Sequence, residues 1–230
     1  MALEYIKYFR YNKYVQEYLR ETYFIDFNHQ LIKDYLEDLD RSLPITEQCI
    51  YLYNKVRDGF AYFPYNMDVT RPAMKASYQV QQKTGYCTQK AILLTALFRA
   101  IFVPARLQFF IVRNHLGTGR LEKLLKTDKI VFHAGLQVYL KEKWIKLSPA
   151  FDSQICKKLK VATLNFNGKS DAIFQEFNSK DSSTYMEYLY DYGEFADFPY
   201  EFALKELVKH YPHVFDQSIP SNERKVFKYW

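Results

Sequence analysis

The chain has 230 residues, of which 48% are hydrophobic and 25% charged, a composition typical of a folded globular protein rather than a disordered one. Its net charge of +6 is spread along the chain, whereas nucleic-acid binders gather positive charge on one face, so we expect no nucleic-acid partner. There is no apolar run of roughly 20 residues, no secretory leader at the start and no close cysteine pair, so we expect no membrane insertion, no metal or other cofactor, and a cytoplasmic location.

Residues 1–58 are predicted to be helical. Apolar side chains recur at helical spacing in two short segments, around residues 14–19 and 31–39, and a third helix is predicted to follow Pro44 and to extend through Val56. From Phe60 to Thr84 two prolines interrupt the pattern, which predicts a loop with a short helix within 74–83.

Residues 87–101 form the clearest predicted helix. Its apolar residues fall at steps of three and four and predict an amphipathic helix with one buried stripe: Ala91, Leu94, Leu97, Phe98 and Ile101. The pair Val103-Pro104 is expected to end the helix. Cys87 stands at its first position.

Three β-strands are predicted next, at 105–112, 130–140 and 144–147. Alternation in the second strand places Val131, His133 and Gly135 on one face and the apolar residues between them on the other. A short turn over residues 141–143 predicts a hairpin in which Leu140 lies opposite Trp144. Extended by that register, the hairpin would bring His133 near Phe151 and Asp152.

The remaining residues, 153–230, carry weaker signals. Turns are predicted at Asn167-Gly168 and at Tyr192-Gly193, and a closing helix over 202–211. We expect one α+β domain over 1–230, with a helical N-terminal part (1–58), a core (59–152) and a C-terminal extension (153–230).

Cys87 is the first candidate for chemistry. Unpaired N–H groups and the positive end of the helix dipole meet at the first turn of a helix. Both favour the thiolate, which is the attacking species, and the same N–H groups can hold an oxyanion. The alternative is a small buried core residue, since free cysteine is among the most buried types; Cys49 and Cys156 are assigned to that class.

A catalytic thiol needs a base, and the base needs a group that orients it. His133 is the candidate base because the other face of its strand is apolar and Gly135 leaves space beside it, although a lone strand histidine is often structural. Asp152 is the candidate orienting group on the hairpin register. Pro149 leaves this third assignment open because proline cannot extend a regular ladder.

Taken together, these residues resemble the transglutaminase-like superfamily. The run Gly85-Tyr86-Cys87, the apolar helix ending in Arg99-Ala100, and Pro104-Ala105-Arg106 are similar to its nucleophile segment. The segment from His133 to Tyr139 and the strand at Trp144 are similar to its histidine strand and the next one. The tail around residues 166–172 and 186–188 is similar to a bacterial branch of stand-alone members.

The resemblance implies a papain-like α+β core in which the nucleophile helix packs on an antiparallel sheet. It implies a Cys87-His133-Asp152 triad that acts on amides of a protein or peptide substrate through an acyl-enzyme, as a protease, an amidase or a transglutaminase. The family's aspartate position holds Ser148 here, in Leu147-Ser148-Pro149. Either Asp152 or Ser148 could therefore orient the histidine, and a non-catalytic binding module is the alternative function.

Overall fold

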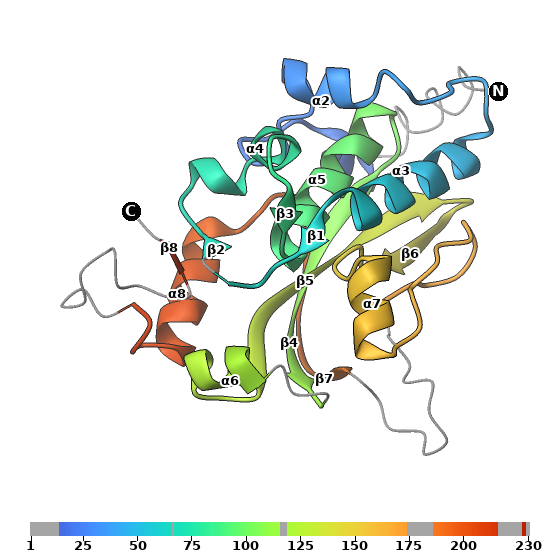
Figure 1. The fold of residues 1–230 in the computed structure, drawn as a ribbon. Helices are drawn as coiled ribbons and strands as arrows, with labels where there is room; N and C mark the ends of the chain where they lie inside the picture. Colours follow the sequence, from blue (N-terminus) through green and yellow to red (C-terminus); the bar gives the residue numbers. More distant parts are fainter. Residues whose placement is uncertain (1–13, 66, 116–118, 174–185, 216–226, 229–230) are drawn as a thin grey trace.

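The computed structural model describes residues 14–65, 67–115, 119–173, 186–215 and 227–228. Its main sheet has four antiparallel strands in the order β6-β5-β4-β7 (Figure 1). The strands are β4 (Ala105–Asn114), β5 (Lys129–Leu140), β6 (Lys143–Leu147) and β7 (Met186–Phe195). The first three confirm the predicted strands.

β7 contradicts the turn predicted at Tyr192-Gly193. Gly193 lies inside the strand with a φ of +88°, where the pairing of β7 with β4 shifts its register. Glycine adopts positive φ without steric cost, so at this position it permits an irregularity within a strand instead of a chain reversal.

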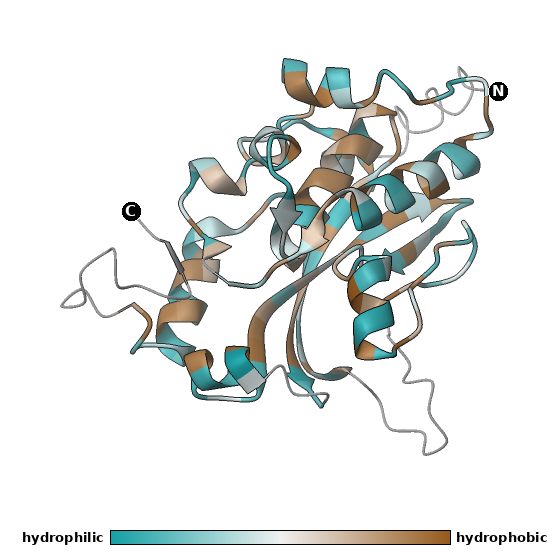
Figure 2. Cartoon of the chain, viewed as in Figure 1, coloured by the Kyte–Doolittle hydropathy of each residue, from teal (hydrophilic) through white to brown (hydrophobic). Residues whose placement is uncertain are grey.

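Helix α5 (Cys87–Ala100) packs on β5 and β4 with one side and on α3 (Ile45–Gly59) and α4 (Ala76–Val80) with the other. Every residue from Cys87 to Arg99 is buried, and Figure 2 shows the helix as a largely hydrophobic element inside the molecule. The predicted bounds are confirmed, but the expected amphipathic character is wrong. Tertiary packing encloses its polar side chains as well.

The N-terminal part is less helical than predicted. Within residues 14–58 it contains a 3-10 turn η1 (Gln16–Leu19), the short α2 (Gln30–Tyr35) and α3, which Pro44 precedes as expected. In the connections, side chains accept hydrogen bonds from backbone N–H groups that a helix would use: Thr22 accepts the N–H of Ile25, and Asp40 accepts that of Ser42. Such local bonds compete with helix formation. Residues 1–13 of this prediction lie outside the described part.

Shorter elements surround the N-terminus of α5. Strand β1 (Ala61–Tyr62) pairs in parallel with β3 (Thr84–Gly85), and β2 (Met67–Asp68) pairs in parallel with β8 (Phe227–Lys228). The remaining elements are η2 (Pro72–Met74), α6 (Gly119–Leu125), α7 (Ser153–Leu159) and α8 (Tyr200–His210). α4 and α8 confirm the helices predicted within 74–83 and over 202–211, whereas α6 and α7 were not predicted.

The β5–β6 hairpin differs from the expected register by one residue. Tyr139 lies opposite Trp144 and Leu140 opposite Lys143. The turn is two residues long, with Lys141 and Glu142 both at positive φ (49° and 63°), which is the backbone of a tight type I′ connection. The ladder ends at Leu147, before it reaches Asp152. The pairing of β5 with β6 therefore does not place Asp152 opposite His133.

A bulge interrupts the predicted alternation in β5. The pairing with β4 shifts between Phe110 and Val112, and Phe132 has a φ of +61°. Val131 and Phe132 consequently both face the main core instead of opposite sides of the sheet. Bulges redirect side chains in this way at the edge of functional sites.

The hydrophobic core lies mainly between the sheet and the helices. Phe109 belongs to a large cluster shared by α3, α5, β5 and α8, whereas its neighbour Phe110 belongs to a small cluster with Cys156 and Ile173. The two faces of β4 are thus both covered, which explains why this strand is buried along most of its length.

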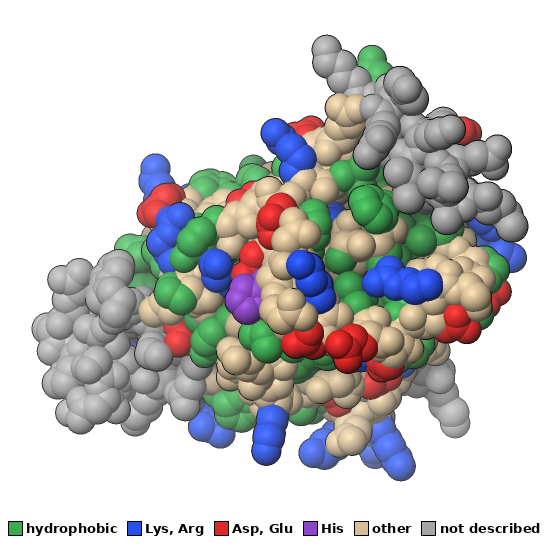
Figure 3. All heavy atoms as spheres, turned by 90° about the horizontal axis from the view of Figure 1, so that it is seen from above, with side chains coloured by type: hydrophobic (Ala, Val, Ile, Leu, Met, Phe, Trp, Pro, Cys, Tyr) green, Lys and Arg blue, Asp and Glu red, His purple; other side chains and the backbone are tan. Residues whose placement is uncertain are grey.

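On the face shown in Figure 3, basic and acidic side chains are interspersed among hydrophobic ones over the described part of the chain. In that same part, no helix combines the length and the hydropathy that crossing a bilayer demands.

Candidate active site

Cys87 is the first residue of α5, as predicted. Tyr86, the N-cap residue, makes no side-chain hydrogen bond to the first turn of the helix. Gly85 packs tightly in front of it, since a Cβ there would lie 2.9 Å from Nε2 of Gln79 and 3.1 Å from Cγ of Lys90. A larger residue here would have to displace the side chains of Gln79 and Lys90, so glycine allows β3 to lie close to the start of the helix.

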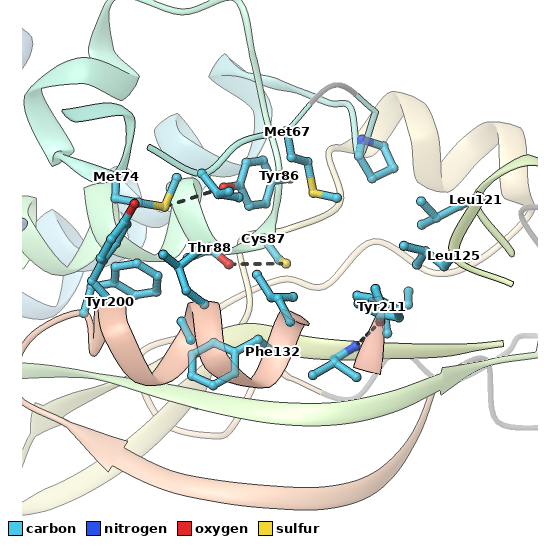
Figure 4. A pocket seen from close by; sticks show the side chains of 18 of the residues that line it. Met67, Met74, Tyr86, Cys87, Thr88, Leu121, Leu125, Phe132, Tyr200 and Tyr211 are labelled. Atoms are coloured by element: carbon cyan, nitrogen blue, oxygen red, sulfur yellow. Dashed lines mark hydrogen bonds between the residues drawn. The ribbon is translucent and has the colours of Figure 1, made fainter. Parts of the chain in front are cut away.

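Opposing effects act on the Cys87 thiol, which is 6% exposed. Burial disfavours the thiolate, but a positive charge on His133 favours it, as do hydrogen bonds from the Ala134 N–H and the Thr88 hydroxyl. The favourable effects are larger, so the pKa of Cys87 lies below its ordinary value. The Thr88 Oγ1 is 3.9 Å from the sulfur (Figure 4). In Cys49, by contrast, burial alone raises the pKa.

His133 lies in β5 next to the bulge and is 3% exposed. Its Nδ1 is buried and has no hydrogen-bond partner among the described residues. The space expected beside it at Gly135 is occupied, because a Cβ there would lie 3.0 Å from the Leu147 carbonyl and 3.2 Å from Ile173. A side-chain hydrogen bond and the charge of His133 both act on the Cys87 thiol. The structure thus brings the two side chains together, in a closed setting rather than on an open strand face.

Asp152 is buried nearby, but its hydrogen bonds go elsewhere. Oδ2 accepts the N–H of Tyr62 at 2.7 Å, and Oδ1 accepts the N–H of Ile155 at 2.9 Å as the N-cap of α7. Both oxygens are therefore engaged by backbone donors, and neither bonds to Nδ1 of His133. The carboxylate anchors β1 and α7 beside the site.

Ser148, the alternative orienting residue, is also buried. Its N–H donates to the Ala172 carbonyl at 2.8 Å, and its own carbonyl accepts the Tyr53 hydroxyl at 3.0 Å. These backbone contacts fix the chain after β6.

Two buried cations fix α5 at its ends. One turn after Cys87, the Lys90 Nζ donates to the carbonyls of Arg57, Phe60 and Ala150 at 2.8, 3.0 and 2.9 Å. Burial lowers the pKa of Lys90 to about 7, against the opposing charge of Asp152. Near the other end, Arg99 donates to carbonyls of three separate segments, at residues 20, 105 and 196.

The sequence contained a signal for both cations, namely charged residues inside an otherwise apolar helix, but not for their partners. The carbonyls that they bind belong to α3, to the start of β4 and to connecting segments, most of them far apart in the sequence, and only the fold brings them together. Because an unpaired buried charge is costly, these contacts hold the segments around the helix in one arrangement.

A pocket of about 650 Å³, partly open to solvent, extends from the Cys87 sulfur. Figure 4 shows Met74 and Tyr200 at one end and Leu121 and Leu125 at the other. Sequence patterns did not predict it, since its walls come from β2, η2, α5, α6, the bulge of β5 and α8. Within the described residues, no three His, Cys, Asp or Glu side chains are grouped as a metal ion would require.

The chain is similar to one protein family and to a solved structure. No curated protein matches the chain. A crystal structure from Cytophaga hutchinsonii, described as a "Putative Cysteine Protease", is similar with 18% identity and a TM-score of 0.46; the match covers 60% of this chain and 42% of that one. The model of the transglutaminase-like superfamily matches residues 33–149, just over half of the chain. The chain belongs to the transglutaminase-like superfamily.

Proposed function

We propose that this protein is a thiol-dependent enzyme that cleaves amide bonds through an acyl-enzyme, with Cys87 as the nucleophile and His133 as the base. One observation carries the proposal: a thiol at a helix start has its pKa lowered by a buried histidine whose Nδ1 has no partner among the described residues. A purely structural cysteine would instead resemble Cys49, whose pKa burial raises.

In the first half-reaction, His133 takes the thiol proton and the Cys87 sulfur attacks the carbonyl carbon of the substrate. The carbonyl π electrons move to oxygen, and the N–H groups of the uncapped first turn of α5 stabilise that oxyanion. When the C–N bond breaks, His133 gives the proton to the leaving amine, and a thioester on Cys87 remains.

In the second half-reaction, water attacks the thioester with His133 as the base, which releases a carboxylic acid and restores the thiol. An amine in place of water would give transglutaminase-type transfer with the same residues. We propose hydrolysis, which makes the protein a protease or amidase, and treat transfer as an outcome of the test.

For Asp152 we propose a positioning role. Its contacts with the N–H groups of Tyr62 and Ile155 support a role in holding the pocket wall and α7 rather than in binding the imidazole. A protein or peptide substrate, the absence of nucleic acid or membrane as partners, and a cytoplasmic location remain predictions from the sequence.

The proposal is tested by incubating the full-length protein with a library of fluorogenic peptide amides, with and without a primary amine. We expect release of the fluorophore that C87A and H133A abolish and that C49A leaves intact. Amide cleavage that persists in C87A would contradict the proposal. Stable binding of peptides without turnover would favour the non-catalytic binding module instead.

A further inference from the structure

The pocket beside Cys87 has an almost uniformly apolar lining. Apart from Thr88, whose hydroxyl lies near the sulfur, its walls are aliphatic, aromatic or sulfur-containing side chains. No Asp, Glu, Lys, Arg or His contributes to the lining among the described residues. A cavity with such walls is poorly suited to a charged group, which would lose its hydration without gaining a partner.

Two of the few polar atoms at the pocket are already engaged. The Tyr86 hydroxyl donates to the Asp68 carbonyl at 3.3 Å. The Tyr211 hydroxyl donates to the Lys129 carbonyl at 2.9 Å and accepts the Val131 N–H at 2.7 Å. A primary amide such as a glutamine side chain would therefore find few partners there.

The position of His133 indicates which part of a substrate the pocket receives. The base must reach the leaving amine, so the leaving group lies on the His133 side of the sulfur. His133 is not among the residues that line the pocket, whereas Cys87 is. Because the cavity reaches Cys87 and not the His133 side chain, we assign it to the acyl part of the substrate.

We propose that this pocket is the acyl-specificity site and that it binds a large apolar group, either an aromatic or a branched aliphatic side chain, next to the scissile carbonyl. The inference rests on the proposed function. The apolar lining suits a side chain of that class, and the bulge at Phe132, which turns both Val131 and Phe132 toward the pocket, builds one wall.

The test compares N-acetyl aminoacyl coumarin amides of Phe, Leu, Gln and Gly. We expect kcat/KM for the Phe and Leu substrates to exceed that for Gln and Gly by at least about tenfold, the usual discrimination of an apolar pocket. A readout independent of turnover is alkylation of Cys87 by N-benzyl iodoacetamide against iodoacetamide, in which the benzyl reagent should react faster.

Two pocket variants and a matched control sharpen the test. A203F fills the pocket from α8, and L204N places a polar group on its half-buried rim; both should reduce the preference for Phe over Gly and for the benzyl reagent. V208F makes a comparable enlargement on the exposed side of α8 and should retain the preference.

The outcomes separate the two proposals. Turnover that depends on Cys87 but favours Gln or Gly, or a preference unchanged in both pocket variants, would overturn the pocket assignment and leave the enzyme intact. Absence of any turnover that depends on Cys87, together with a benzyl preference that A203F removes, would overturn the amide-cleaving function while the apolar pocket stands.

Discussion

At the scale of single residues, the sequence predicted the candidate catalytic pair but not the side chains around it. Cys87 and His133 were predicted from a helix start and a strand, and the structure brings them together. Asp152 was placed near His133 by a hairpin register that proved one residue off. The register depends on the backbone conformation of Lys141 and Glu142, which are not residues that usually mark a type I′ turn.

Asp152 provides a prediction at this scale. In D152N we expect a loss of roughly 1–2 kcal/mol in the free energy of unfolding, because a carboxylate that accepts two backbone N–H groups is replaced by an amide with one acceptor. The pH midpoint of Cys87 alkylation should not move. Urea denaturation and a labelling profile measure the two quantities.

The exposed D34N is the control for the charge change, and we expect it to alter neither quantity. If the labelling midpoint of D152N moved toward that of H133A, Asp152 would be the orienting group of the imidazole, and its assignment to the pocket wall would be wrong.

At the scale of elements, strong periodic patterns predicted α3, α5 and the strands β4 to β6. β7 was missed because Tyr192-Gly193 resembles a turn, and α5 was taken as amphipathic because its apolar residues recur at steps of three and four. The same helix carries the charged residues Lys90 and Arg99. In the fold both cations are buried on backbone carbonyls. The extent of β7 depends on pairing across the sheet, and the burial of the two cations depends on contacts with segments distant in the sequence. Neither is visible in the local sequence.

The β5–β6 turn offers a prediction about an element. Lys141 and Glu142 occupy left-handed conformations that cost most residues about 1 kcal/mol each, whereas Asn-Gly adopts them readily. The added flexibility of glycine in the unfolded chain offsets part of this gain. The double variant K141N/E142G should therefore raise the free energy of unfolding by a net amount of roughly 1 kcal/mol. Thermal unfolding measures this, with K143N in the adjacent strand as the control; a lower melting temperature would show that the turn is not of this type.

At the scale of the whole molecule, the candidate site extends beyond the residues that match the superfamily. The match ends at residue 149, yet Phe198, Tyr200 and Leu207 line the pocket, and β7 covers the edge of β4. The C-terminal residues, which carried the weakest signals in the sequence, thus complete both the sheet and the proposed specificity site.

A chain shortened to residues 1–152 tests this dependence. Its β4 edge would be unpaired and Phe109 would lose contact with Phe195 and Phe198, so we expect aggregation or loss of cooperative unfolding. Circular dichroism and sedimentation of the shortened and full-length chains provide the comparison. Cooperative unfolding of the shortened chain at the full-length melting temperature would show that the C-terminal part is dispensable for the fold.

The most direct test of the central claim is the rate of Cys87 alkylation by iodoacetamide as a function of pH, followed by mass spectrometry. Because the pKa of Cys87 is lowered, its thiolate persists at lower pH, and labelling should reach half its maximal rate below the pH of an ordinary thiol; buried Cys49 and Cys156 should stay unlabelled. In H133A burial remains without the opposing charge, so the midpoint should rise and labelling at pH 7 should fall by about tenfold for each unit of pKa. Equal profiles for the wild type and H133A would contradict the pairing of Cys87 with His133.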